Sequence, residues 1–372
     1  MPLSAFTRTP VDRRVFLRLS GTGALALAGA TVLAACSSSS SSTGGSTSAG
    51  SKKADYGTIA VQLSWIKNIE FSGEYFATEK GYYTDAGFSG VTLIANSGST
   101  TAEDVVVSGQ ALVGLSSVSA TAPAIVKGAP LKTIATTYQK NPFCLLSLEE
   151  KTPIKTPADL KGKTIGVQSG ANQVIWDGFL KANGIDASEV KTVTTQFSIA
   201  PLEQGKYDAH FSYLTNEPIL AKQDGFTPVT LGFADNGLPF VAETYIVTDD
   251  TLKNKRDLLK AFLIAEIKGW TDAVKDPAQS ATYAVKKYGA DQKLDVTEQT
   301  AEATAQNGLI VTDDTNSNGL LTISKDLIDQ NITSLAGMDV TITAKDLFDT
   351  SLIEEIYKEH PELIVSLPVA SA

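Results

Sequence analysis

From residue 56 onward the chain alternates between two spacings of apolar residues. Short runs rich in β-branched and aromatic residues predict strands, and stretches with an apolar residue every three or four positions predict helices. The predicted strands are residues 58–63, 91–95, 112–115, 131–137, 142–148, 164–168, 190–195, 209–213 and 240–248. The predicted helices are residues 71–86, 101–108, 120–127, 172–183, 200–204 and 217–222, with a short helical turn at 157–160.

Strands that alternate with helices predict an α/β fold of open, mainly parallel sheets flanked by helices. The pattern restarts after residue 150, so we expect two lobes. The apolar strands 142–148 and 240–248 are expected to cross between them as a two-strand hinge. The first lobe would then hold residues 56–142 and 248–372, and the second lobe residues 143–247. Bilobed proteins hinged in this way close on ligands held between the lobes.

Most of the chain after residue 251 is predicted to be amphipathic helix. One helical face carries the apolar residues Leu258, Leu259, Phe262, Leu263 and Ile267. This segment is therefore expected to cover the first lobe.

The N-terminal segment differs from the rest of the chain. Arg13 and Arg14 precede an apolar run at residues 21–35, which is too short to span a bilayer comfortably, and Leu-Ala-Ala leads to Cys36. We interpret residues 1–35 as a twin-arginine lipoprotein signal peptide. Residues 36–55 would be a lipidated Cys36 followed by a flexible Ser/Gly-rich tether. Because one acyl chain binds membranes only marginally, a diacylglycerol-type anchor on the outer face of the bacterial cytoplasmic membrane is expected.

The charge excludes one class of partner. The 372 residues include 41 acidic and 31 basic side chains, a formal charge of −10. Removal of residues 1–35 would take away four arginines and Asp12, leaving 27 basic and 40 acidic groups, or −13. Nucleic-acid binding is disfavoured because a phosphate backbone requires a basic face.

The sequence predicts no catalytic, cofactor or metal site. Cys144 stands alone in a predicted strand, which favours a buried small hydrophobic residue over a nucleophile. The sequence around Cys144 contains no acid or base motif, and the chain has two histidines, His210 and His360. Residues 314–319 resemble the first half of a calcium loop, but Lys325 occupies the position that requires a glutamate.

Several motifs are similar to those of a known family. They are SWIKN at 64–68, FSGEYFATEKGYY at 71–83, AGF at 86–88, VSGQA at 107–111, KGAP at 127–130, PADLKGKTIG at 157–166 and LEQGKYDA at 202–209. In order and spacing they resemble substrate-binding proteins of bacterial ABC importers. The branch they resemble serves nitrate, sulfonates, taurine, thiamine pyrimidine precursors and, in some members, riboflavin.

The resemblance implies a type II periplasmic-binding-protein fold in a monomer that captures a small molecule and delivers it to an ABC permease. Some relatives of this branch are pyrimidine-synthesising enzymes that depend on histidine and a cysteine-rich segment. The chain has no cysteine cluster, so we expect a binding protein and not an enzyme. An exported enzyme on the same scaffold stays open as the alternative.

Candidate ligand-binding residues lie where predicted strands end, because ligands of open α/β sheets bind beyond the carboxyl ends of strands. They are Trp65, Asn68, Phe71, Glu74 and Tyr75 in the first loop; Ser116, Ser117 and Ser119 in the second; Ser169, Gly170, Asn172 and Trp176 in the third; Tyr213, Asn216 and Glu217 in the fourth; and Glu243 in the apolar return segment. Phe71 and Tyr75, four residues apart, could equally form the buried stripe of a helix. Helix capping could account for single serines and for Asn216.

The same residues predict the charge of the ligand. Arg256 is the one arginine after residue 35, and it lies in a helical run, so no guanidinium is expected to grip an anion. The candidate loops instead offer flat aromatic rings and the carboxylates of Glu74, Glu217 and Glu243. We therefore expect a neutral or weakly cationic heterocycle with N–H donors, such as an aminopyrimidine or a flavin-like ring. Lysines and backbone N–H groups leave an alkanesulfonate, taurine or nitrate as the alternative.

Overall fold

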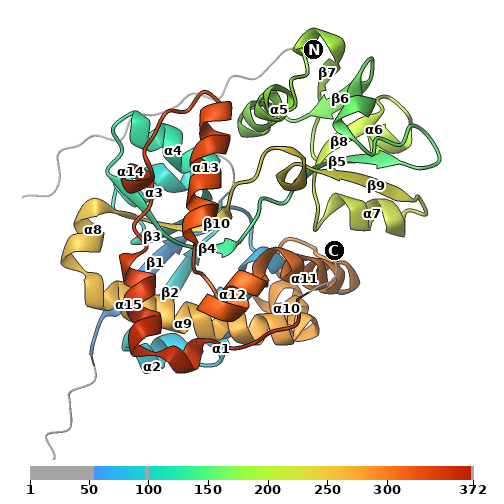
Figure 1. Ribbon diagram of the computed structural model, residues 1–372. Coiled ribbons are helices and arrows are strands. Elements are labelled where there is room, and N and C mark those ends of the chain that lie inside the picture. The colour runs from blue at the N-terminus through green and yellow to red at the C-terminus, as the bar shows by residue number, and fades with distance from the viewer. Residues whose placement is uncertain (1–53, 97–99, 370–372) are drawn as a thin grey trace, which may run out of the picture. The chain divides into compact units, whose positions relative to one another are not determined.

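The computed structural model describes residues 54–96 and 100–369, whose strands form two five-stranded sheets (Figure 1). The first sheet has the order β2-β1-β3-β10-β4 and contains β1 (Gly57–Gln62), β2 (Phe88–Ile94), β3 (Val113–Ser117), β4 (Leu131–Tyr138) and β10 (Ala242–Thr248). The second sheet has the order β7-β6-β8-β5-β9 and contains β5 (Phe143–Leu148), β6 (Thr164–Val167), β7 (Lys191–Thr194), β8 (Ala209–Tyr213) and β9 (Pro228–Gly232). The predicted signal peptide, Cys36 and the tether up to residue 53 lie outside the described residues.

Both sheets are mixed, which corrects the expectation of mainly parallel sheets. In the first sheet β1 pairs parallel with β2 and β3, whereas β10 is antiparallel to β3 and β4. In the second sheet β6 pairs parallel with β7 and β8, whereas β5 is antiparallel to β8 and β9. The antiparallel strands β5 and β10 are the two that follow a crossing from the other sheet.

The chain crosses between the sheets after β4 and after β9. β10 lies in the first sheet, so residues 242–247 belong with the first lobe and the predicted second lobe, 143–247, extends too far. The apolar pattern of a strand does not show which sheet the strand joins, so it could not locate the boundary between the two lobes. β9 was not predicted, because Pro228 at its start weakens the strand pattern.

Helices cover both faces of each sheet. One face of the first sheet packs against α1 (Ser72–Glu79), α2 (Tyr82–Ala86), α9 (Arg256–Lys275), α10 (Pro277–Tyr283), α11 (Val296–Ile310) and α15 (Ser351–Glu359), and the other face packs against α3 (Ala102–Val107) and α4 (Val118–Val126). The second sheet packs against α5 (Ala171–Ala182) on one face and against α6 (Ala200–Glu203) and α7 (Glu217–Gln223) on the other. The remaining helices are α8 (Asp249–Asn254), α12 (Asp313–Asn318), α13 (Lys325–Gly337) and α14 (Ala344–Leu347).

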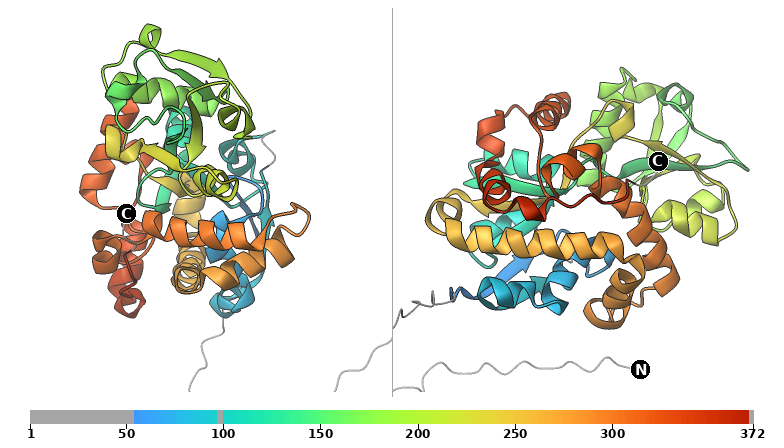
Figure 2. Two further views of the ribbon diagram at one scale, coloured as in Figure 1. Left: turned by 90° about the vertical axis from the view of Figure 1, so that its right-hand side faces the viewer. Right: turned by 60° about the horizontal axis from the view of Figure 1, so that its bottom comes forward.

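The predicted helix 71–86 is two helices. Gly81 has a φ of 75°, a left-handed conformation that glycine adopts without steric cost, and it separates α1 from α2. The predicted apolar face of α9 is confirmed, because Leu259, Phe262, Leu263 and Ile267 are buried against the first sheet. The right-hand view of Figure 2 shows α9 lengthwise, with α1 and α2 beside it.

Glycines bring α1 and α9 unusually close together. A β-carbon built on Gly269 of α9 would lie 2.2 Å from the carbonyl oxygen of Gly73, and one built on Gly73 would lie 2.3 Å from the ring of Trp270. The backbones of the two helices therefore touch at this crossing.

The apolar core beneath α5 is shared between the two parts of the chain. It contains Trp176 and Phe179 of α5, but also Val118 of α4 and Leu335 of α13, which lie within the predicted bounds of the first lobe. We call this cluster the shared core. It joins the sheets on one side through apolar contacts. No helix in the described part of the chain is both long and apolar enough to cross a bilayer.

Candidate functional site

The carboxyl ends of the parallel strands bring together loops that are far apart in the sequence. In the first sheet these are the loops after β1 and β3, and in the second sheet the loops after β6, β7 and β8. Loops of this kind form the ligand sites of open α/β sheets. We therefore place the candidate site at these strand ends.

Two aromatic rings meet across the candidate site. Trp65, in the loop after β1, lies with its ring centroid 5.4 Å from that of Phe197, in the loop after β7. Trp65 is 37% exposed and Phe197 54% exposed, although large aromatic residues are usually more buried. Trp65 was predicted, but Phe197 was missed. Its signal was a single aromatic residue in the polar stretch directly after a predicted strand.

A second contact joins the two sides of the site. Asn216, at the start of α7, donates a hydrogen bond to the carboxylate of Glu302 on α11. Tyr213 at the end of β8 packs against the apolar core of the first sheet, and its amide donates to Glu217 over 2.8 Å. The predicted residues of the fourth loop, which follows β8 of the second sheet, thus reach the side of the site that the first sheet and its helices form.

Four carboxyl groups gather at this place, and we call them the carboxyl cluster: Glu70, Glu217, Glu243 and Glu302. Glu217, Glu243 and Glu302 are buried and Glu70 is half-buried. Burial raises the pKa of Glu70 and of Glu217 to about 7 and the pKa of Glu302 to about 9. The negative charge of Glu70 raises the pKa of each of the other three further. The cluster is therefore partly protonated near neutral pH, and its groups can both donate and accept hydrogen bonds.

Glu243 is held in a strained conformation at a β-bulge. Its φ is 48°, and the register of β10 against β3 shifts between Ala242 and Thr244. Its carboxyl oxygens accept from the hydroxyl of Ser64 at 3.0 and 2.8 Å. Burial raises the pKa of Glu243 well above its usual value. Bulges and left-handed residues other than glycine cluster at functional sites, where they aim a side chain. Here the bulge aims Glu243 at the loop that carries Trp65.

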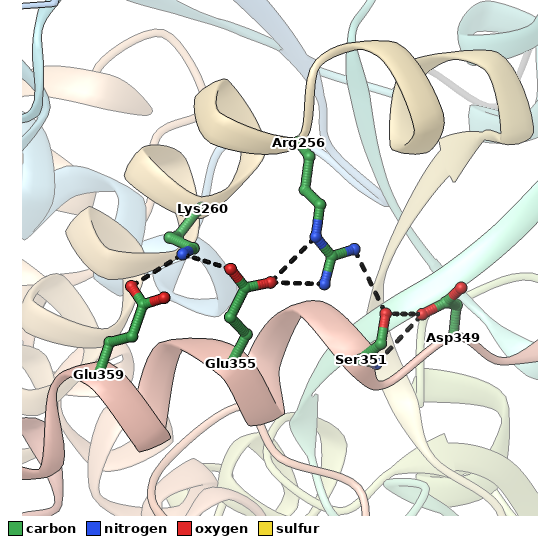
Figure 3. Close-up of polar contacts among 6 residues, drawn as sticks. All are labelled: Arg256, Lys260, Asp349, Ser351, Glu355 and Glu359. Carbon is green, nitrogen blue, oxygen red and sulfur yellow. Dashed lines mark hydrogen bonds and ion pairs between the residues drawn. The ribbon is translucent and has the colours of Figure 1, made fainter.

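No basic side chain in the described ranges is hydrogen-bonded to the carboxyl cluster. Arg256 is occupied elsewhere: its guanidinium donates to Glu355 of α15 at 2.7 and 3.0 Å and to Ser351 at 3.3 Å (Figure 3). Lys260 donates to Glu355 as well. Residues 54–96 and 100–369 also contain no group of three or more His, Cys, Asp or Glu side chains arranged to hold a metal ion.

Three predicted aromatic residues are not part of the candidate site. Phe71, Tyr75 and Trp176 have no exposed surface. Tyr75 stacks on Tyr288, and Trp176 lies in the shared core, where its indole N–H donates to Thr192 over 2.9 Å. For Phe71 and Tyr75 the alternative of a buried stripe is the correct one, because the helical spacing that suggested a ligand surface equally suits a core.

Glu74 is also removed from the candidate site. It lies in the core of the first sheet, where one oxygen accepts from Tyr245 over 3.1 Å and the other has no partner. The Tyr245 hydroxyl oxygen also lies 3.3 Å from a carboxyl oxygen of Glu266, and burial raises the pKa of both glutamates. Glu74 and Glu266 therefore form a buried acid pair beneath α1 and α9.

Four other predicted residues have structural partners. Asn68 is buried, and its side chain caps the short helix at Ile69–Phe71 by accepting from the amide of Glu70. Ser116 is buried and donates to Glu103 over 2.6 Å. Ser117 and Ser119 bond to each other over 2.6 Å and are half-buried. Ser117 and Ser119 are therefore the residues of the second loop that have accessible surface for a ligand.

The loop after β6 keeps its predicted accessibility. Ser169 and Gly170 are exposed, and Gly170 has a φ of 89° at the start of α5. Asn172 is half-buried and donates to Gln168 over 3.0 Å. These three residues remain candidates.

Pockets elsewhere do not coincide with these loops. One of about 530 Å³ lies between the end of α5, residues 237–239 and α13, and another of about 380 Å³ lies between α12, α13 and α15. We keep the candidate site at the strand ends, because the exposed aromatic rings and the carboxyl cluster meet there. The calcium-like segment belongs to α12, and Cys144 is a buried free cysteine in β5, as expected.

Comparison with sequence families and curated proteins gives three matches. A family model described as "NMT1/THI5 like" matches residues 68–280. The riboflavin-binding protein RibY of Chloroflexus aurantiacus is 24% identical over 271 residues, which cover 68% of this chain and 76% of RibY. A putative thiamine biosynthesis protein of Haemophilus influenzae is 26% identical over 200 residues, which cover 51% of this chain and 63% of that protein.

Solved structures share the fold at low sequence identity. A putative periplasmic sulfonate-binding protein SsuA from Methylobacillus flagellatus superposes with a TM-score of 0.62 at 13% identity, covering 86% of this chain and 99% of the other. A Candida albicans protein described as having the generic periplasmic binding protein fold gives 0.54 at 13% identity, covering 84% and 98%. The desulfurization enzyme DszB gives 0.56 at 13% identity, covering 81% and 99%. The periplasmic-binding-protein fold predicted from the sequence is thus confirmed.

Proposed function

Since the chain belongs to the NMT1/THI5-like family, we propose that it is a solute-binding protein that captures a small heteroaromatic compound and delivers it to an ABC permease. The observation that carries the proposal is the carboxyl cluster beside the exposed rings of Trp65 and Phe197. The fold supports capture between two lobes, and RibY, the relative named for riboflavin binding, supports a ring-shaped ligand.

The carboxyl cluster favours a ligand with N–H donors. Glu70 and Glu217 have a pKa of about 7, so each is partly ionised at neutral pH and can accept a hydrogen bond from a ring or amino N–H. An anion placed there would be repelled by the ionised carboxylates. Trp65 and Phe197 provide flat surfaces for the ring. An aminopyrimidine or a flavin-like ring fits this set better than nitrate, taurine or an alkanesulfonate.

Calorimetric titration of the parent protein tests the ligand class. The compounds are riboflavin, aminopyrimidines, taurine, an alkanesulfonate and nitrate. A stacked aromatic contact contributes about 0.5–1.5 kcal/mol beyond its buried area, so Trp65→Ala should weaken heterocycle binding at least about tenfold. Val126→Ala, on an exposed residue at the far end of α4, is the control and should bind as the parent does.

The pH dependence of binding tests the role of the carboxyl cluster. Glu70 and Glu217 lose protons as the pH rises through about 7. An aminopyrimidine with a permanently charged quaternary ammonium substituent should therefore bind more tightly at pH 8 than at pH 6, whereas a neutral flavin should change little. Glu70→Gln should flatten the response to the cation. Tight binding of nitrate or a sulfonate, with heterocycles inert, would overturn the ligand class and leave a solute-binding role intact.

The fold also occurs in the enzyme DszB, so an exported enzyme is the second candidate. The two functions differ in the fate of the ligand. A solute-binding protein releases its compound chemically unchanged, and mass spectrometry of the compound before and after incubation decides between them. Delivery to a permease agrees with the lipid anchor inferred at Cys36, which would place the protein on the outer face of the cytoplasmic membrane.

A further inference from the structure

His210 lies inside the second sheet, between two loops of the candidate site. It is on β8, fully buried, and it pairs with Gly166 of β6 and Leu146 of β5 in the neighbouring strands. Its Nε2 atom is 3.1 Å from Nε2 of Gln168, and its Nδ1 atom is 2.7 Å from the hydroxyl of Tyr207. Neither contact was predicted from the sequence, because no motif surrounds His210.

The side-chain amide of Gln168 has one consistent orientation. Its Nε2 atom lies 3.1 Å from the carbonyl oxygen of Phe211, which can only accept, so the NH₂ group must face Phe211. Its Oε1 atom accepts from Asn172 over 3.0 Å. The second hydrogen of the NH₂ group is then directed to Nε2 of His210, which must accept it.

The orientation of Gln168 fixes the proton of His210. A ring nitrogen that accepts carries no hydrogen, so His210 is neutral and its proton lies on Nδ1. Burial lowers the pKa of His210 to about 4, which agrees with a neutral ring. The Nδ1–H group donates to the oxygen of Tyr207, and the hydroxyl hydrogen of Tyr207 is left to donate to Thr195 over 3.2 Å.

The hydrogen bonds therefore form one directed chain from Asn172 through Gln168, His210 and Tyr207 to Thr195. Gln168 begins the loop after β6, and Asn172 is the second residue of α5, which follows that loop. Thr195 begins the loop after β7 that carries Phe197.

The sheet makes room for this chain of hydrogen bonds at Gly166. A β-carbon on Gly166 would lie 2.7 Å from the ring of Tyr207, so a larger residue would displace the phenol.

We propose that His210 is a positioning residue that holds the loops after β6 and β7 in the arrangement a ligand requires, and that it acts as the neutral Nδ1–H tautomer. The inference rests on the proposed function, because it assigns these loops to ligand binding. His210 has no exposed surface to offer a ligand. It acts through Gln168 and Tyr207, which reach the loops.

The tautomer is measured on the parent protein with ¹⁵N-labelled histidine. The chain has two histidines, His210 and His360, so the spectrum holds two sets of ring signals. We expect His210 to show a protonated Nδ1 and an unprotonated Nε2 throughout pH 6–8. The side chain of His360 is 40% exposed, lies beside Glu362 and provides the internal reference. An Nε2–H tautomer, or a doubly protonated ring at pH 7, would overturn the inference.

Three variants test the positioning role. His210→Phe keeps a buried ring but removes both hydrogen bonds, and should weaken the binding of riboflavin, the probe used, about tenfold. His210→Gln retains one donor and one acceptor and should restore part of the affinity. Tyr207→Phe removes the two hydrogen bonds of the Tyr207 hydroxyl, to His210 and to Thr195, and leaves the bonds of Gln168 to His210 and Asn172 in place. Unchanged ligand affinity in His210→Phe would contradict the proposal.

Hydrogen exchange separates this inference from the proposed function. The amide of Thr195 donates to Val167 over 3.1 Å, and the amide of Val174 donates to Gly170 over 3.3 Å. Both should exchange faster in His210→Phe, and the first alone in Tyr207→Phe, while the amide of Leu214 in the loop after β8 keeps its rate. If the parent binds no heterocycle, the proposed function fails, and the tautomer and exchange rates still decide the role of His210.

Discussion

Replacing Gly269 by alanine tests how closely α1 and α9 are packed. The new β-carbon would lie 2.2 Å from the carbonyl oxygen of Gly73 and 2.9 Å from the β-carbon and amide of Ala77. The first distance is more than 1 Å short of ordinary van der Waals contact, and the other two are about 0.5 Å or more short of it. Two of the three contacts are backbone atoms, which cannot rotate away as the end of a flexible side chain can. The helices must therefore move apart.

Two effects of opposite sign determine how much Gly269→Ala changes the free energy of unfolding. Alanine is favoured over glycine inside a helix by about 1 kcal/mol, whereas overpacking a close-packed site typically costs about 1–3 kcal/mol. Because rigid backbone absorbs the clash, the upper end of that range applies, and Gly269→Ala should lower the free energy of unfolding by about 2 kcal/mol. At an m-value of about 3 kcal/mol/M this is a fall in the urea midpoint of roughly 0.7 M.

Gly337→Ala is the matched control. Gly337 is also in a helix, at the end of α13, but a β-carbon there would meet no atom within 4 Å. Its midpoint should stay unchanged or rise, since only the helix propensity changes. Equilibrium unfolding in urea, followed by circular dichroism, compares both variants with the parent. A midpoint for Gly269→Ala at or above that of the parent would show that the α1–α9 crossing is looser than the structure indicates.

Four further predictions concern pH, the anchor and closure. The raised pKa of the buried pair Glu74 and Glu266 means that the folded state holds more protons than the unfolded state above pH 4.5, so stability should fall as the pH rises. In thermal melts at several pH values, Glu266→Gln should flatten this fall. An equally steep fall in the variant would contradict the pairing. The pKa of Glu355 is lowered to about 2 by Lys260 and Arg256, so the contribution of Glu355 to the stability of the folded state should disappear as the pH falls from 4.5 to 2. Glu355→Gln should therefore make the loss of stability with acid less steep over that pH range. Cys36→Ser should move the protein from the membrane to the soluble fraction, and a variant that stays membrane-bound would refute the lipid anchor. A saturating heterocycle should reduce the radius of gyration in small-angle scattering, whereas identical curves would count against closure.

Much of the fold could be predicted from the alternation of strand and helix patterns. The places where ligand-facing loops begin could also be predicted, because an apolar strand followed by polar residues marks a carboxyl end, as at Trp65, Ser169 and Asn216. Periodicity could not give the direction of pairing, because a buried strand such as β5 or β10 has the same apolar pattern whether its neighbours run parallel or antiparallel to it.

Other features of the candidate site depend on contacts between residues that are far apart in the sequence, so they could not be predicted from it. Glu302 lies in the middle of a helix and meets Asn216 only through folding, so no local signal marks it. Glu74 looked accessible because it follows a strand, but the turn of α1 directs it to Tyr245. Phe197 had a local signal that could have been used.

The C-terminal helices have a consequence for how the protein folds during synthesis. Leu335 and Met338 of the α13 region complete the shared core beneath the second sheet, while Leu352 and Ile356 of α15 complete the core of the first sheet. Neither core is whole until these residues have left the ribosome, even though every strand of both sheets has been made by Thr248. We therefore do not expect one complete domain to fold before the other has been made, although that order is common in chains of this length. Both sheets are expected to keep apolar surface uncovered until the same late segment has been made.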